Sequence, residues 1–143
     1  MIAYFDTSAL LTFVLREEGR DVALDIWERA QTVVTSQLTY PEALAALAAA
    51  RRAGRLDAGG HRESVRRIDA RWRQLAAVDL DPGMAADAGA LAHDHGLTGA
   101  DAVHLAAALA LRAADLVFVS WDGRLAEGAL AAGLPVTPDS AAP

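Results

Sequence analysis

The sequence predicts an α/β fold, a three-layer α/β/α sandwich around a mostly parallel central sheet. Short apolar or β-branched segments of strand length alternate with longer segments of helical spacing along most of the chain. The 143 residues suit a single domain with one sizeable core, and no repeat or long linker divides them. The composition is 53% hydrophobic and 22% charged, which is typical of a globular domain, and the abundant alanine favours helices.

The first third of the chain alternates between strands and helices. An apolar run followed by Asp6 predicts a buried strand, and Thr7 and Ser8 are able to cap the helix after it. Gly19 separates this helix from the next, and a β-branched run predicts the second strand. The expected elements are a strand at Ile2–Phe5, a helix from about Ala9 to Leu15, a helix at Asp21–Ala30 and a strand at Thr32–Thr35.

Two long helices then interrupt the alternation, so residues from about 40 to 75 form a helical excursion within the single domain, 1–143. Thr39-x-x-Glu42 has the form of a capping box. The expected elements are a helix from Thr39 to about Ala53, a turn at Asp57-Ala-Gly-Gly and a helix over roughly His61–Leu75.

The last part of the chain returns to the alternation of strands and helices. Thr98-x-x-Asp101 again resembles a capping box, with Asp in place of Glu. The tail after Pro138 is expected to fray. The expected elements are a strand at Val78–Leu80, a helix from Pro82 to Gly96, a helix opened by Thr98, a strand at Leu116–Val119, a helix after Ser120 to about Ala131 and a short strand within Gly133–Thr137.

The composition excludes several classes of enzyme. The chain has no cysteine, and therefore neither disulfides nor thiolate metal ligands. All 13 basic residues are arginine, so the lysine of a P-loop NTPase and the lysine of Schiff-base chemistry are both missing. No signal peptide and no apolar stretch of membrane-spanning length is visible. We expect a cytoplasmic protein with no membrane partner.

The charge is unevenly distributed along the chain. The net charge is −6, but residues 51–73 contain eight arginines and three acids, which gives this window +5 and the remainder −11. A basic block on an acidic body is a plausible footprint for phosphates, although a solvated arginine-rich helix surface has the same composition. The arginines that we expect to contact nucleic acid are Arg51, Arg52, Arg55, Arg62 and Arg66.

Four acids share one local context, because each lies at the end of a predicted strand or at the start of a predicted helix. Asp6 and Asp122 follow strands, whereas Glu42 and Asp101 lie in first helical turns. In a parallel sheet these positions meet at one edge, where ligand sites form. Each acid alone is also explained by helix capping or by the helix dipole. Together, without cysteine, they suit one or two hard ions such as Mg²⁺ or Mn²⁺, which activate water and hold a scissile phosphate.

The stretches around these acids are the strongest motifs in the chain. They are Ile-Ala-Tyr-Phe-Asp6-Thr-Ser8-Ala-Leu, Ser36-Gln-Leu-Thr-Tyr-Pro-Glu42-Ala, Leu97-Thr-Gly-Ala-Asp101-Ala-Val-His104-Leu-Ala-Ala-Ala and Leu116-Val-Phe-Val-Ser120-Trp-Asp122-Gly-Arg-Leu125. In this order and spacing, over nearly the whole chain, they resemble PIN domains and especially the VapC-type toxins of bacterial toxin–antitoxin pairs. The third and fourth motifs in succession are the most specific.

The resemblance implies a parallel-sheet sandwich, an acidic pocket and Mg²⁺- or Mn²⁺-dependent endoribonuclease activity. It implies that Ser8 and Ser120 position a carboxylate or a water molecule. It also implies a homodimer and a small antitoxin protein that binds and silences each copy. The residues that match the catalytic and metal-binding acids of the family are Asp6, Glu42, Asp101 and Asp122.

Two other functions remain open at this point. Phe5-Asp6-Thr7-Ser8 has some likeness to phosphatases with an aspartate nucleophile, but Ser8 stands where they carry a second Asp, and their lysine is absent. A catalytically silent PIN-like module that binds RNA or protein is the non-enzymatic alternative. His104 follows Asp101 on the same helical face, and we expect it to be a part-buried helix histidine rather than a hydrogen-bond partner of the site.

Overall fold

A five-stranded parallel sheet forms the middle layer of the protein in this computed structural model, which describes residues 1–15 and 17–139. The strand order is β3-β2-β1-β4-β5, and each neighbouring pair is parallel. The expected α/β class is therefore confirmed. The strands are β1 (Ile2–Phe5), β2 (Thr32–Ser36), β3 (Ala76–Val78), β4 (Leu116–Val119) and β5 (Val136–Thr137).

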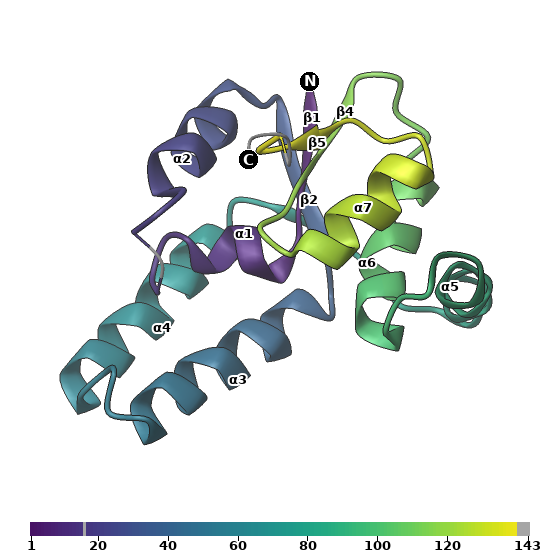
Figure 1. Ribbon diagram of the computed structural model, residues 1–143. Coiled ribbons are helices and arrows are strands. Elements are labelled where there is room, and N and C mark those ends of the chain that lie inside the picture. Colours follow the sequence, from purple (N-terminus) through teal and green to yellow (C-terminus); the bar gives the residue numbers. More distant parts are fainter. Residues whose placement is uncertain (16, 140–143) are drawn as a thin grey trace.

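Helices cover both faces of this sheet, with α1 to α4 on one side and α5 to α7 on the other (Figure 1). The alternation of β1 side chains divides the core, since Ala3 and Phe5 pack under α1–α4 and Tyr4 packs under α5–α7. No helix among the described residues is long and apolar enough to cross a membrane. The helices are α1 (Thr7–Leu11), α2 (Arg20–Arg29), α3 (Thr39–Arg52), α4 (Ala58–Trp72), α5 (Pro82–His95), α6 (Gly99–Ala110) and α7 (Gly123–Ala131).

The direction of winding reverses at β1. From β1 the chain adds β2 and β3 on one side, and it later adds β4 and β5 on the other side. In parallel α/β sheets a ligand crevice opens beyond the carboxyl ends of the strands at such a reversal. Asp6 directly follows β1, and Ser120 directly follows the adjacent β4, so both residues lie at the sheet edge where a crevice of this kind is expected.

Several element boundaries differ from the sequence-based expectation. The first helix begins at Thr7 and ends at Leu11, because Asp6 rather than Thr7 or Ser8 accepts the capping hydrogen bond from the Ala9 N–H. The expected turn at Asp57-Ala-Gly-Gly is wrong, since Asp57 caps α4 and the residues after it form its first turn. The third strand is Ala76–Val78 rather than Val78–Leu80. Of the tail expected to fray, residues 140–143 lie outside the described part of the chain.

The capping box expected at Thr39 and Glu42 is not formed. Leu38 is the N-cap residue of α3 and makes no side-chain capping bond. The buried Thr39 hydroxyl instead pairs with the Thr35 hydroxyl at 2.6 Å, and Thr35 donates to the Phe5 carbonyl oxygen at 2.6 Å. These hydroxyls join the ends of β1 and β2 to the start of α3. The Glu42 carboxylate is thereby left for other contacts.

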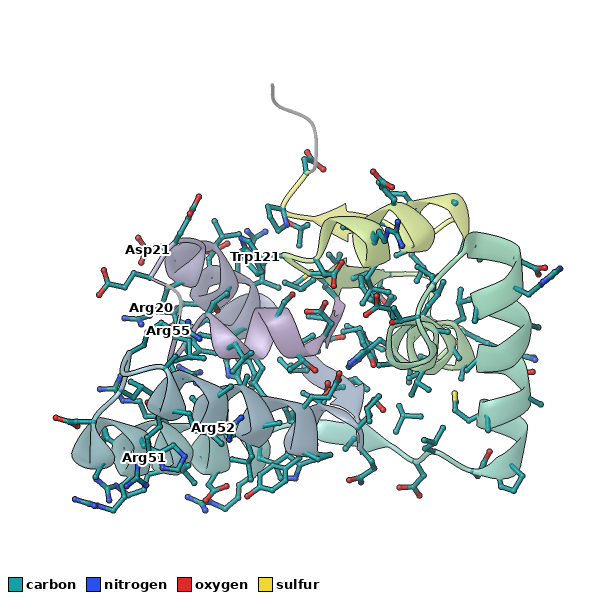
Figure 2. The ribbon with its side chains drawn as sticks, turned by 60° about the horizontal axis from the view of Figure 1, so that its bottom comes forward. Arg20, Asp21, Arg51, Arg52, Arg55 and Trp121 are labelled. Carbon is teal, nitrogen blue, oxygen red and sulfur yellow. The ribbon has the colours of Figure 1, made fainter. Side chains whose placement is uncertain are left out.

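Gly19, the N-cap residue of α2, packs directly against the Trp121 ring. Its backbone is left-handed, with φ of +86°, and a Cβ atom built there would lie 2.5 Å from the ring. Figure 2 shows Trp121 beside α2. Because Trp121 lies between Ser120 and Asp122, this contact braces the segment that follows β4.

We expect Gly19→Ala to lower the free energy of unfolding by about 2 kcal/mol, because the new methyl group meets both a disfavoured φ and the Trp121 ring. Thermal or urea unfolding measures the change. The matched control is Gly89→Ala in α5, where nothing lies within 4 Å of the built Cβ, and where alanine stabilises a helix by about 0.5–1 kcal/mol. Equal effects of the two substitutions would contradict the packing described for Trp121.

Candidate active site

Asp6 is the most buried acid of the crevice, with 2% of its surface exposed. Its Oδ1 accepts hydrogen bonds from the Ser8 hydroxyl at 2.6 Å and from the Ala9 N–H at 2.9 Å, and its Oδ2 accepts one from the Ser120 hydroxyl at 2.5 Å. Burial raises the pKa of Asp6 above its ordinary value, although the hydrogen bonds from Ser120 and Ser8 act in the opposite direction. Asp6 is thus a carboxylate held in place by donors from two segments of the chain.

The two serines also fix the segment that follows β4. The Ser8 oxygen accepts a hydrogen bond from the Trp121 N–H at 2.8 Å, and the Ser120 oxygen accepts one from the Asp122 N–H at 3.0 Å. Each hydroxyl therefore donates to Asp6 and accepts from the backbone of the β4–α7 connection. Ser8 stands where an aspartate-nucleophile phosphatase would carry a second acid, and here it supplies Asp6 with a donor instead.

Glu42 belongs to a second hydrogen-bonded group that spans both faces of the sheet. Its Oε1 accepts from the Thr7 hydroxyl at 2.7 Å and lies 2.7 Å from His104 Nε2. His104 Nδ1 lies 2.9 Å from the Tyr4 hydroxyl. An ionised carboxylate only accepts, so Nε2 carries the proton, and in the neutral ring Nδ1 then accepts from Tyr4. Burial, and next the charge of Asp6, raise the pKa of Tyr4 well above its ordinary value, which keeps this donor protonated.

The contacts of Glu42 change its pKa more than its partial burial does. Burial acts to raise its pKa, but the hydrogen bonds from His104 and Thr7, and the charge of His104 when its ring is protonated, lower the pKa below its ordinary value. Glu42 therefore stays ionised under mildly acidic conditions. The expectation of a merely part-buried His104 is wrong, because this residue is 2% exposed and joins Glu42 to Tyr4.

Asp101 and Asp122 supply two further carboxylates to the same edge. The backbone N–H of Asp101 donates to the Thr98 hydroxyl at 3.2 Å, as the predicted cap requires. Asp122 is the N-cap residue of α7, and its Oδ1 accepts from the Leu125 N–H at 3.2 Å. Burial raises the pKa of Asp101, and the negative charges of Asp122 and Glu42 raise it further. These three acids are therefore electrostatic neighbours.

The four acids lie at the same sheet edge, but their side chains do not converge on one metal-binding position. His104 in its protonated form lowers the pKa of Asp6, Glu42 and Asp101 alike. Among the described residues, however, no three acidic or histidine side chains are assembled so as to hold a metal ion. Hydrogen bonds to the protein instead fix Asp6, Glu42 and Asp122. As a donor set, four carboxylates and neighbouring hydroxyls suit a hard cation such as Mg²⁺ or Mn²⁺.

The arginines expected to contact RNA lie on α3, on α4 and between them, away from the acids. Arg51 is nine residues after Glu42, which corresponds to about 14 Å along the helix axis. Figure 2 shows Arg51 and Arg52 at the far end of α3. All five side chains are exposed, and Arg66 donates to Glu63. The five are Arg51, Arg52, Arg55, Arg62 and Arg66.

Three residues of this site have roles that local sequence patterns do not reveal. Those patterns place Tyr4 only in a strand, Thr7 only at a cap, and His104 at an ordinary helix position. Their joint role follows from contacts across 35 to 100 residues of sequence, which no local pattern contains. The available signal is the placement of His104 one helical turn after Asp101.

The sequence profile of the PIN domain matches residues 3–129. Ribonuclease VapC45 from Mycobacterium tuberculosis (strain CDC 1551 / Oshkosh) is 41% identical over 137 residues, which cover 96% of this chain and 95% of that protein.

The fold is also similar to solved structures of low sequence identity. FitAcB from Neisseria gonorrhoeae has a TM-score of 0.71 at 19% identity, covering 95% of this chain and 96% of that one. A toxin-antitoxin complex from Klebsiella pneumoniae has a TM-score of 0.61 at 21% identity, covering 84% of this chain and 86% of that one. The profile match and the 41% identity show that the chain belongs to the PIN-domain family, and to its VapC type.

Proposed function

We propose that the chain is a metal-dependent endoribonuclease and the toxin of a toxin–antitoxin pair. The observation that carries this proposal is the placement of four acids at one sheet edge, in a chain that is 41% identical over 137 residues to a VapC ribonuclease. Single-stranded RNA is the proposed substrate class, and 5′-phosphate and 3′-hydroxyl ends are the proposed products.

Asp6, Glu42, Asp101 and Asp122 are the residues that would hold one or two ions, Mg²⁺ or Mn²⁺. A divalent cation supplies charge to neutralise the scissile phosphate and lowers the pKa of water. The fit rests on the chemistry of the donor set and on the raised pKa values of Asp6 and Asp101, both of which a nearby cation would lower.

The other polar residues orient these carboxylates. Ser8 and Ser120 hold the two oxygens of Asp6 from opposite sides, and they connect Asp6 to the segment that carries Asp122. Thr7 and His104 hold Oε1 of Glu42. Fixed carboxylates favour catalysis, because little reorganisation is then needed when charge develops on the phosphate.

The proposal includes a homodimer and a small antitoxin protein that binds and silences each copy. A solved structure of similar fold is itself a toxin-antitoxin complex, which supports a protein partner for this chain. The alternative, a PIN module without catalysis, retains the fold but requires no response to divalent ions. Response to an ion therefore separates the two functions.

We expect Asp6→Asn and Asp101→Asn each to reduce RNA cleavage by at least about 10²-fold, because each removes a negative oxygen that a cation requires. The measurement compares wild type and both variants on a panel of structured RNAs with Mg²⁺, Mn²⁺ or EDTA. Asp94→Asn, an exposed acid near the end of α5, is the matched control and keeps wild-type activity. Equal cleavage by wild type and by the two site variants would rule out the proposed site.

We expect stability to depend on pH through Asp101. The pKa of Asp101 is raised in the folded chain, so the folded chain keeps this proton to a higher pH than the unfolded chain does. Stability is therefore lost as pH rises from 3.8 through the raised pKa. Asp101→Asn should therefore gain stability relative to wild type as pH rises across this window in EDTA.

Thermal unfolding of both proteins at a series of pH values measures this difference. A divalent ion binds the deprotonated carboxylate, so the increase in Tm that Mn²⁺ gives to wild type should grow over the same window. A difference between the two proteins that does not change with pH would contradict the raised pKa of Asp101.

We expect His104→Ala to weaken both Mn²⁺ affinity and kcat by about 10–100-fold, because Glu42 loses a fixed donor. His104→Gln keeps an N–H donor and should recover part of both. The metal-induced shift in Tm is the deciding measurement, since a purely structural role would lower Tm and leave this shift unchanged. Tyr40→Phe is the control, because it removes a side-chain hydrogen bond to Asp69, away from the site.

A further inference from the structure

A hollow of about 490 Å³ lies between α2, α4 and the residues after α1. We call it the arginine hollow, because three of its lining side chains are Arg20, Arg67 and Arg71. Phe13 and Leu24 supply apolar surface. Of the described residues that line it, none is acidic. Figure 2 shows Arg20 between the ribbons of α2 and of the α3–α4 pair.

Arg71 is held by aromatic rings. Its guanidinium carbon lies 4.1 Å from the centre of the Phe13 ring and 4.8 Å from that of the Trp27 ring. Burial lowers the pKa of Arg71, and the charge of Glu28 acts against this effect. Stacking fixes the planar group and leaves its N–H donors for another acceptor.

Among the described residues, the other two arginines also have few hydrogen-bond partners. Arg20 donates from Nε to the Thr12 carbonyl oxygen at 3.1 Å, which anchors the side chain through one of its five N–H groups. Arg67 lies 3.5 Å from Glu63, and both side chains are more than 45% exposed, so this pair contributes little. The hollow is therefore rich in donors and in positive charge.

Glu63 lies beside Arg67 and the charge of Glu28 acts on Arg71, so these two acids offset part of the repulsion among the three cations. An anion that enters the hollow would offset more of it. Guanidinium groups match the oxygens of a phosphate, to which they donate paired hydrogen bonds. An apolar wall beside these donors suits a ligand that carries sugar or base next to its phosphate. Nucleic acid combines these features, whereas an acidic peptide offers carboxylates without a flat apolar unit beside each one.

We propose that the arginine hollow is a second anchoring site for RNA, which binds a backbone phosphate outside the catalytic crevice. This inference rests on the proposed ribonuclease function. Phe13 is seven residues after Asp6, and turns with i→i+3 hydrogen bonds continue from the end of α1 to Phe13, so the hollow lies on the order of 10 Å from that acid. A strand cut at the crevice reaches this distance within a few nucleotides. The anchoring arginines of this site are then Arg20, Arg67 and Arg71, none of which belongs to the set expected from the sequence.

The test measures binding of a fluorescent single-stranded oligouridylate of twelve nucleotides to the Asp101→Asn protein, with and without Arg67→Gln and Arg71→Gln together. We expect the paired arginine substitutions to weaken binding by about tenfold or more. The slope of log affinity against log salt concentration should also become less steep by about 0.7 for each phosphate that the variant no longer binds. Arg29→Gln, on the same helix as Arg20 and paired with Asp25, is the control and should bind as Asp101→Asn does. Arg20→Gln with Arg67→Gln replaces the first pair if Arg71→Gln lowers Tm strongly.

Kinetics on the same oligonucleotide separate the two proposals. With Asp101 intact, the paired arginine variants should raise KM and leave kcat unchanged. Cleavage with unaltered affinity in the variants overturns the inference and leaves the proposed function standing. Weaker binding by the variants, in a chain that does not cleave RNA at all, supports the hollow and overturns the proposed function. Polyglutamate is the comparison ligand for both proteins. If the paired arginine variants lose binding to polyglutamate but bind oligouridylate as before, the hollow binds an acidic protein and the RNA site is overturned.

Discussion

Asp6 lies at the end of the central strand, almost wholly buried, and an ionised carboxylate in such a position is stable only when donors surround it. Ser8, Ser120 and the Ala9 N–H provide those donors. Because the same two hydroxyls also accept from the backbone after β4, the requirement of one carboxylate fixes the start of α1 relative to the β4–α7 segment. This connection joins the ends of the two strands that carry Asp6 and Ser120.

The second group of contacts crosses the sheet itself. Tyr4 points to the face covered by α5–α7, whereas Glu42 comes from α3 on the other side, and His104 of α6 joins them at the sheet edge. The carboxylates around the buried Asp6 thus have pKa values shifted in opposite directions. Hydrogen bonds lower the pKa of Glu42, while burial raises the pKa of Asp101. A cation is the simplest means of keeping all of them ionised together.

Positive charge is concentrated on a different part of the molecule. The chain carries −6 overall, yet the arginine hollow between α2 and α4 has no acidic lining side chain among the described residues. Separation of the two charges suits a polyanionic substrate, because a cation bound at the acidic edge, as proposed, and guanidinium groups in the hollow would both attract phosphate. Arg71 stacks on Phe13, and this contact holds its guanidinium group in place within the hollow.

The local sequence by itself determined the fold class and most elements, because strand and helix periodicities and cap residues act over a few neighbours, and it indicated the four acids as candidates. Capping could have explained each acid alone, and for Asp6 and Asp122 the structure shows that capping does occur. Only the tertiary structure decided that Glu42 is not in a capping box but bonds Thr7 and His104, and that Arg20 of α2 joins two arginines of α4. The physical reason is that these contacts depend on which side chains meet across the sheet and between helices, and local periodicity carries no information about distance between remote segments.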